Sequence, residues 1–379
     1  MQNVPVSSLG IPDAVLARAR RAACDISRSA ANLDGAVSID ADEILTGRAG
    51  LLGLAPAGRD SAGGSTHLLS MRDGWCALTL SRIDDVELVP ALLELSQQPT
   101  DPWVALAAAA TDRDADEFVA RARLLDLPAA VLGETPPAPP RFVPAGPRAP
   151  HGLSGLLVAD LSSMWAGPLC GHLLAAAGAA VVKVESRSRP DGARHGDPRF
   201  FDWMNSSKLS YATDFRDDDL RPLLEAADVV IEGSRPAALI RRGLGPKQTR
   251  ARPGRIWLRI TGYGTAGERG DRVAFGDDAA VAGGLVGAGV VFVGDAIADP
   301  LTGLAATQAV LGALGRGGGE IVEVALAEVA AGYATGPLTV SPKSAEAVRV
   351  PAPSLARAAE LGADNQRVRR LIEARLTPC

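Results

Sequence analysis

The sequence predicts an α/β protein in which a Rossmann-like parallel sheet domain, flanked by helices, is accompanied by a smaller α+β domain and a C-terminal tail. The chain has 379 residues, which is long enough for two domains with their own cores. Hydrophobic residues make up 47% and charged residues 22%, as is typical of a globular protein. After residue 152, strand-like and helix-like runs alternate, and this alternation favours a parallel sheet covered on both faces.

Two proline-rich stretches divide the chain. Residues 133–152 can form neither a continuous helix nor an inner strand, so we expect an extended linker there. A second proline-rich stretch, residues 335–354, separates a short C-terminal tail from the rest of the chain. We therefore predict a small α+β domain over 1–140, a Rossmann-like domain over 141–335, and an extended linker with a C-terminal helix over 336–379.

The small domain is predicted from short, well-marked segments. The N-terminal residues carry an Arg-rich amphipathic pattern, which predicts a surface helix. Strands are expected at 73–80 and 128–133. Helices are expected at 84–97 and 114–126, each opened by Asp residues that suit a helix N-terminus.

The larger domain repeats a strand, loop and helix pattern. Its expected strands are 155–162, 180–185, 228–234 and 254–264, and its expected helices include 169–179 and 219–227. Ligands of such sheets bind at the carboxyl ends of the strands. The loop after the first strand contains no GxGxxG, so hydride transfer with a nicotinamide cofactor is disfavoured.

The composition disfavours several other functional classes, such as nucleic-acid-binding, metal-binding and membrane-spanning proteins. The net charge is −5 and no basic block is present, which argues against nucleic acid as a partner. The four cysteines and four histidines have no metal-ligand spacing, so no metal site and no disulfide framework are expected. There is no secretory signal pattern, and the alanine-rich windows are too short to span a membrane. We expect a cytoplasmic protein.

Residues 294–314, GDAIADPLTGLAATQAVLGAL, predict a helix that begins at an acid. From these residues alone, Asp299 followed by Pro300 is typical of a helix cap. A carboxylate at a helix N-terminus is also kept ionised by the dipole, and the unpaired N–H groups there can stabilise an oxyanion. Asp299 is therefore a cap or a nucleophile. The rival acid, Asp295, is expected in a turn.

Five segments in chain order resemble family III CoA transferases, a family that includes formyl-CoA transferase, carnitine CoA-transferases and alpha-methylacyl-CoA racemase. The segments are LLVADLSSMWAGPLCGHLLAAAGAAVVKVE (156–185), NSSKLSYATDF (205–215), ADVVIEGSRPAALIRRGLG (227–245), ITGYGTAG (260–267) and GRGGGEIVEVALAE (315–328). Residues 45–80 resemble the family's entry into its small domain, yet here they come first. We therefore expect the small domain to precede the large one, in a permuted order.

The resemblance implies a role for each candidate site residue. Asp299 falls on the catalytic aspartate, whose carboxylate attacks an acyl-CoA thioester to give a mixed anhydride and then an aspartyl-CoA thioester. Coenzyme A thioester is then a substrate, a small carboxylic acid is the acceptor, no permanently bound cofactor is needed, and the chain forms a homodimer that is possibly interlocked. The implied coenzyme A contacts are Ser163, Met164, Trp165, Ala166, Arg187, Thr213, Arg216, Gly233 and Arg241, and the implied glycine loop is Gly63 and Gly64. Trp165 is expected either to stack on adenine or to pack.

Some positions depart from the family pattern. Its Glu-Asn-Phe is Glu232-Gly233-Ser234 here, and Ser186 stands where a base is common. The histidine that helps the racemases move a proton is absent from the stretch around Asp277 and Asp278, two acids that can act only as caps or as proton carriers with a raised pKa. Transferase activity is therefore favoured over racemase or isomerase activity, and a CoA-binding protein without turnover is the third possibility.

Overall fold

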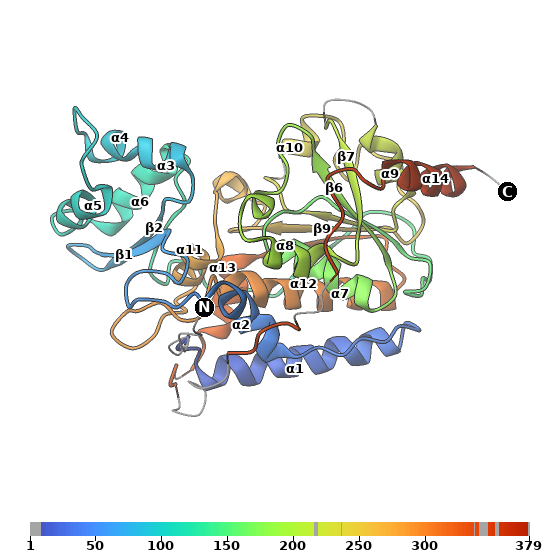
Figure 1. Cartoon of the computed structure of the whole chain (residues 1–379), viewed down its shortest axis with the longest axis horizontal. Helices are drawn as coiled ribbons and strands as arrows, with labels where there is room; N and C mark the ends of the chain where they lie inside the picture. Colours follow the sequence, from blue (N-terminus) through green and yellow to red (C-terminus); the bar gives the residue numbers. More distant parts are fainter. Residues whose placement is uncertain are drawn as a thin grey trace.

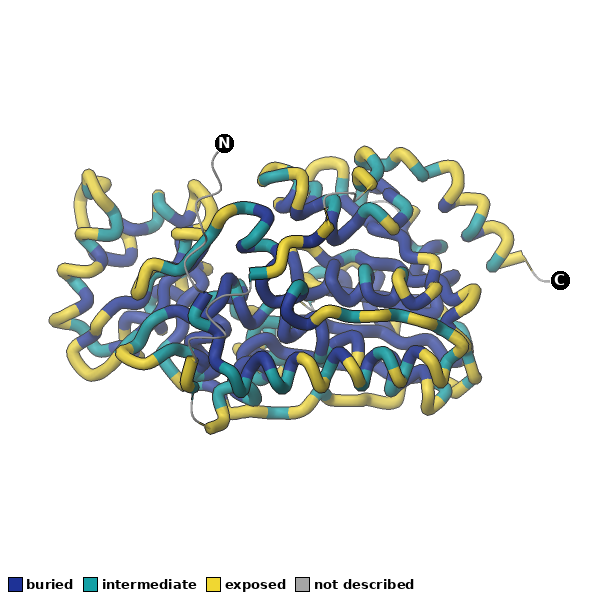
Figure 2. The backbone as a smooth tube through the Cα atoms, turned by 60° about the horizontal axis from the view of Figure 1, so that its bottom comes forward, coloured by how far each residue is buried: buried dark blue, intermediate teal, exposed yellow. Residues whose placement is uncertain are grey.

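The computed structural model places two sheets side by side, a large one and a small one (Figure 1). The structure describes residues 9–215, 219–235, 237–336, 338–340, 348–352 and 356–377. Burial is concentrated at the centre of the larger body, whereas exposed residues follow the loops and the outer faces of the peripheral helices (Figure 2). The predicted fold class is confirmed.

The large sheet has seven strands in the order β4-β10-β9-β8-β5-β6-β7. Its members are β4 (Arg141–Pro144), β5 (Leu157–Asp160), β6 (Ala180–Ser186), β7 (Leu209–Thr213), β8 (Val229–Glu232), β9 (Ile256–Thr261) and β10 (Glu320–Ala325). Six strands are parallel, and β4 pairs antiparallel with β10 at the edge. From β7 to β10 the strand order is that of a Rossmann sheet, and the order reverses between β5 and β8, where ligands of such sheets bind.

Helices cover both faces of this sheet. One face packs against α7 (Ala166–Ala176), α8 (Pro198–Asn205), α12 (Ala298–Gly315) and α13 (Leu326–Tyr333), with α1 (Asp13–Ala31) and α2 (Ala41–Leu52) outside them (Figure 1). The other face packs against α9 (Leu220–Ala226), α10 (Ala237–Ile240) and α14 (Asn365–Leu376). Two short 3-10 helices, η1 (Gly192–His195) and η2 (Gly267–Asp271), lie in loops after β6 and β9. The expected C-terminal helix is thus part of the larger body.

The helix α12 is apolar on all sides, because it lies between the sheet and α1. Its closest helical neighbour is α7. A Cβ atom on Gly303 would lie 2.6 Å from Leu169 Cδ2 on α7, so only glycine permits this approach. The tight contact places the first turns of α7 and α12 together at the carboxyl edge of the sheet.

The small sheet consists of three antiparallel strands, β1 (Thr66–Ser70), β2 (Trp75–Thr79) and β3 (Ala129–Val131). It packs against α3 (Ile83–Glu87), α4 (Val89–Leu93), α5 (Pro102–Ala110) and α6 (Ala115–Leu124) around a core of its own. A small cluster of Leu68, Ala77, Val281 and Phe292 joins it to α11 (Gly276–Ala282) and the loop that follows. The two sheets are therefore in contact through α11.

Residues 84–97, predicted as one helix, form α3 and α4 instead, because Pro90 lacks the N–H that would continue α3. Residues 133–152 run extended and exposed and contribute only the edge strand β4, as expected. Within the range 1–140, α1 and α2 share the core of the large sheet rather than that of the small one, so the domain boundaries stay a prediction.

Candidate active site

Asp299 lies in the first turn of α12, one residue inside the helix, whose N-cap is Ile297. Asp299 is a partly buried residue. The backbone N–H groups of Gly276 and Ala166 donate hydrogen bonds to its carboxylate. These are the first residues of α11 and α7. Three helix N-termini therefore converge on one carboxyl group.

The charge state of Asp299 differs from the expectation. The pKa of Asp299 is raised to about 7, mainly by burial and also by the neighbouring Asp295, although Arg48 and the two N–H groups act to lower it. The prediction that the helix dipole and the unpaired N–H groups keep this acid ionised is therefore wrong near neutral pH, because removal from water outweighs both. Near neutral pH the group exchanges between its two forms.

Asp295 is the partner of an arginine rather than a simple turn residue. It is fully buried, and its Oδ1 lies 2.5 Å from Arg48 Nη1 on α2. The Arg48 guanidinium also lies over two aromatic rings, 5.6 Å from the ring centre of Trp165 and 5.4 Å from that of Phe200. No sequence pattern pointed to Arg48, because it is about 250 residues away from Asp299 in the chain.

Asp277 and Asp278 act in part as structural acceptors. Ala296, just before α12, has a φ of 42°, which is strained for a residue with a side chain. Its N–H donates to Asp277 Oδ1 at 3.0 Å, which holds this turn in place. Asp278 accepts the N–H of Phe275 at 2.8 Å and so caps α11. Burial raises the pKa of both acids to about 7.

Gly276 is the residue that lets α11 reach the carboxylate. A Cβ atom there would lie 2.4 Å from Asp299 Oδ2 and 2.3 Å from the carbonyl oxygen of Ala296. Any side chain would therefore displace the candidate nucleophile or the strained turn before it. Glycine is required at this position because there is no room for a side chain, and not because of the backbone angles of Gly276.

The turn after β5 carries the expected coenzyme A contacts Ser163, Met164, Trp165 and Ala166 and lies at the carboxyl edge, where the strand order reverses. Met164 has a φ of 70° and is exposed. Its N–H donates to Asp191 Oδ1 at 3.0 Å. Trp165, by contrast, is buried and packs edge-to-face on Phe200 with 5.4 Å between ring centres. Of the two roles expected for Trp165, packing is the one the structure favours.

A network of buried charges lies beneath this turn. Lys183 donates to Asp191 Oδ2 at 2.7 Å and to the carbonyl oxygen of Ser162. Lys208 donates to Asp160 Oδ2 at 2.8 Å. Burial opposes ionisation of Asp160, but Lys208 and Lys183 together hold its pKa below the usual value. Except for Asp191, these residues belong to the motifs that carry the family resemblance, and here they position the turn rather than meet solvent.

The remaining rim residues lie at several strand ends. Gly233 is exposed after β8, and a Cβ atom on it would lie 3.1 Å from Ser162 Cβ. Thr213 ends β7 and is buried. Arg187 follows β6 and Arg241 follows α10, and both are exposed. The expected contact at Arg216 lies outside the described residues. The coenzyme A contacts therefore stay a prediction.

The predicted glycine loop lies beside Arg48. Gly63 and Gly64 are exposed, and a Cβ atom on Gly63 would be 3.9 Å from Arg48 Nη2. The same loop is attached to the segment before α12, because the N–H of Phe292 donates to the carbonyl oxygen of Gly58 at 2.8 Å. The loop from the small sheet thus reaches the acid cluster.

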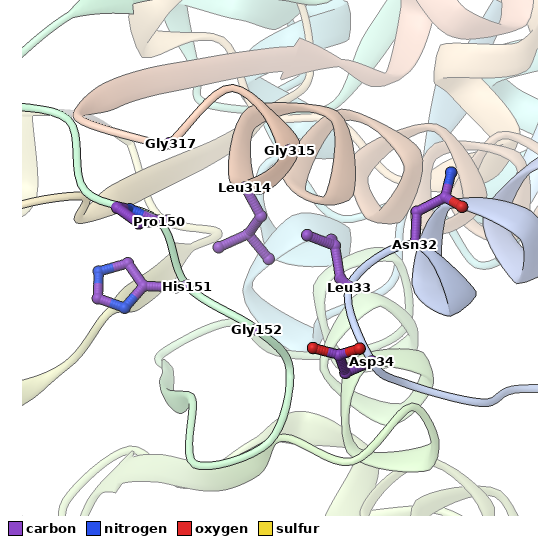
Figure 3. Close-up of a pocket in the computed structure, with 9 residues that line it drawn as sticks. All are labelled: Asn32, Leu33, Asp34, Pro150, His151, Gly152, Leu314, Gly315 and Gly317. Carbon is purple, nitrogen blue, oxygen red and sulfur yellow. The ribbon is translucent and has the colours of Figure 1, made fainter.

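A pocket of about 300 Å³ lies elsewhere (Figure 3). Its lining includes Leu314 and Gly315 from the last turn of α12, together with Leu33 and His151. These positions are about 24 Å along α12 from Asp299, at 1.5 Å per residue. This pocket is therefore separate from the acid cluster. Among the described residues there is no group of side chains able to hold a metal ion, and no helix is long and apolar enough to cross a membrane.

A Rossmann-like parallel sheet with a partly buried acid at its carboxyl edge is typical of α/β proteins that bind their ligands at that edge. A family model described as CoA-transferase family III matches residues 153–360, which is more than half of the chain. The chain belongs to CoA-transferase family III.

Individual relatives match over part of their length. Succinyl-CoA--D-citramalate CoA-transferase of Chloroflexus aurantiacus is 32% identical over 206 residues, covering 48% of this chain and 50% of the relative. A Mycobacterium tuberculosis protein named "Probable fatty acyl-CoA transferase Rv3272" is 32% identical over 204 residues, covering 48% and 52%. A crystal structure of Rv3272 has a TM-score of 0.44 at 31% identity, covering 50% and 57%. The chain spans about half the length of the curated relatives it matches.

Proposed function

We propose that this protein is an acyl-CoA:carboxylate CoA-transferase in which Asp299 is the nucleophile. The observation that carries the proposal is the Asp299 carboxylate, bound by the N–H groups of Gly276 and Ala166, in a chain of CoA-transferase family III. Asp299 is a partly buried residue, as a nucleophile that meets a substrate must be.

The reaction balances without any further reagent. An oxygen of ionised Asp299 attacks the thioester carbonyl and expels CoA thiolate, which leaves a mixed anhydride between Asp299 and the donor acyl group. The thiolate then attacks Cγ of Asp299 and releases the donor as its carboxylate, so that an aspartyl-CoA thioester forms. The acceptor carboxylate attacks this thioester, and the same two steps in reverse give the new acyl-CoA and free Asp299.

The N–H groups at the site suit the steps that occur at Cγ. When thiolate or carboxylate adds to Cγ of Asp299, negative charge develops on an oxygen of that same residue. The N–H groups of Gly276 and Ala166 already donate to this carboxyl group. They can therefore stabilise the tetrahedral intermediate with little rearrangement.

The same chemistry bears on where coenzyme A would bind and on whether the reaction needs a cofactor. Coenzyme A would lie along the turn 163–166, with the exposed Arg187 and Arg241 near its phosphates. The reaction uses only carboxylate, thiol and thioester groups, so it needs neither a metal nor a redox cofactor. We propose in addition that the protein works as a homodimer in the cytoplasm.

The test is exchange of label between an acyl-CoA and a free acid. The donor panel should contain succinyl-CoA and a long-chain acyl-CoA, and the acceptors should include D-citramalate. Asp299→Asn should abolish exchange while far-ultraviolet circular dichroism stays unchanged. For the wild-type protein incubated with an acyl-CoA, mass spectrometry of the intact protein should show a CoA-sized gain, and peptide analysis should assign this gain to residues 294–303. Asp277→Asn, which keeps an oxygen acceptor for Ala296, is the matched control and should retain exchange. Full exchange by Asp299→Asn would refute the proposal.

A second candidate, racemisation or isomerisation of an acyl-CoA, is favoured by one observation. Asp277 is partly exposed beside Asp299 and has a pKa raised to about 7, so it could accept and return a proton near neutral pH, whereas Asp278 is fully buried. Deuterium incorporation at the α-carbon in heavy water, without acyl exchange, would support this candidate. Calorimetric binding of CoA with neither reaction would instead indicate a binding protein.

A further inference from the structure

Arg48 is the charged residue that connects α2 to the acid cluster. It lies outside the matched residues 153–360, in the part of the chain before the linker. Its guanidinium binds the buried Asp295 at 2.5 Å and lies over the rings of Trp165 and Phe200. The Arg48 side chain is itself only 23% exposed, so it is held by protein on several sides.

We propose that Arg48 is a positioning residue that keeps Asp299 in its reactive, charged form by placing a fixed positive charge between Asp295 and the glycine loop. This inference rests on the proposed role of Asp299 and extends it to a residue that the family match does not cover. It predicts that the segment before the linker takes part in catalysis through electrostatics.

Four charged side chains surround Asp299. The charges that face it from the packed elements are Arg48 on α2, Asp295 before α12, and Asp277 and Asp278 on α11. Three of these four groups are acids, and each of them opposes a further negative charge. Arg48 is the one cation among the charged groups recorded at Asp299 in the described residues.

The geometry explains why arginine suits this place. A planar guanidinium can bind a carboxylate at one edge while its faces lie on aromatic rings. Arg48 does both, with Asp295 at its edge and Trp165 and Phe200 beneath it. A position fixed in this way gives a constant field at Asp299, and the glycine loop lies beside the same guanidinium, since a Cβ atom on Gly63 would be 3.9 Å from Nη2.

The experiment separates charge from packing by using four variants of the full chain. Arg48→Met removes the charge and keeps much of the volume, whereas Arg48→Lys keeps the charge. Asp295→Asn removes the opposing acid and leaves Arg48 unneutralised. Arg20→Met is the matched control, because Arg20 on α1 also forms an ion pair with a carboxylate, that of Asp42, at 2.7 Å, but its side chain is 58% exposed.

Two readouts should be recorded for each variant. The first is the infrared titration of the Asp299 carboxyl group, taken as the difference from the same protein carrying Asp299→Asn. The second is the pH dependence of kcat for acyl exchange. Arg48→Met should shift both midpoints upward by about one unit or more, and Asp295→Asn should shift both downward. Arg48→Lys should restore most of the Arg48→Met shift, and Arg20→Met should leave both midpoints unchanged.

These outcomes distinguish the inference from the proposed function. If Arg48→Met lowers activity but leaves the infrared midpoint in place, the inference is refuted even though the enzyme is a transferase. If the infrared midpoints move as predicted while no variant and no wild-type sample catalyses exchange, the electrostatic inference stands and the transferase proposal fails. Equal shifts in the same direction for Arg48→Met and Asp295→Asn would show a structural disturbance and would also overturn the inference.

Discussion

Replacing Lys208 by methionine should destabilise the protein more than any surface substitution. The Lys208 ammonium is buried and has three acceptors: Asp160 Oδ2 at 2.8 Å, the carbonyl oxygen of Pro168 at 2.8 Å, and Asn205 Oδ1 at 3.0 Å. Lys208→Met leaves Asp160 as a buried charge without its nearest cation. Loss of one partner from a buried pair costs about 3–5 kcal/mol in the free energy of unfolding.

The assay is urea unfolding at pH 7, followed by circular dichroism. The pKa of Asp160 lies below its usual value in the folded state, so its contribution is present at neutral pH and is lost only as the pH falls through that lowered value. The double variant Asp160→Asn/Lys208→Met should lose about 1–3 kcal/mol less than the sum of the single losses. Lys247→Met, at an exposed lysine, is the control and should stay within about 0.5 kcal/mol of wild type. A loss below about 1 kcal/mol for Lys208→Met would refute the interpretation of this pair as a buried ion pair.

Three further predictions concern the active site and the surface. Gly276→Ala should abolish exchange, because the new methyl group overlaps Asp299 Oδ2. The control is Gly315→Ala at the other end of α12, whose methyl group meets no atom within 4 Å, and this variant should retain exchange. Equal activity of the two variants would contradict the packing argument. The kcat for exchange should rise as the pH increases through about 7 and then level off, because only ionised Asp299 attacks, and a flat profile from pH 5 to 9 would exclude this. Asp126→Ala should change the free energy of unfolding by less than about 1 kcal/mol, since its ion pair with Arg235 is exposed; denaturant midpoints measure this, and a loss above about 2 kcal/mol would show a larger role.

The parts of the fold that depend on local patterns could be predicted from the sequence. The apolar runs that became β5 and β6 and the Asp-Pro that begins α12 are each determined within a few residues. The buried network could also have been found. Lys183 interrupts the apolar strand AVVKVE, and a charge inside a buried strand requires a partner. That reasoning leads toward Asp191, which holds the turn at Met164.

The electrostatics of the site could not be predicted in this way. The pKa of Asp299 depends on how completely water is removed and on three acids and one arginine that only the folded chain brings together. Arg48 lies within the segment 45–80 that resembles the family, but nothing in that segment indicates that its guanidinium meets an acid about 250 residues away. The exposed fractions of Trp165 and Thr213 likewise follow from tertiary packing, which a motif does not specify.

The raised pKa of Asp299 has a consequence for the direction of the proposed reaction. In the mixed anhydride, thiolate can attack either of two carbonyl carbons, and the weaker base leaves more readily. An ordinary carboxylic acid has a pKa of about 4.3, whereas Asp299 in its folded surroundings has a pKa of about 7. Attack at the donor carbonyl must expel the more basic Asp299 carboxylate, while attack at Cγ expels the less basic donor carboxylate. When the donor carboxylate is released into solvent, away from the burial that leaves Asp299 only partly ionised at neutral pH, this difference favours formation of the aspartyl-CoA thioester over return to the starting acyl-CoA.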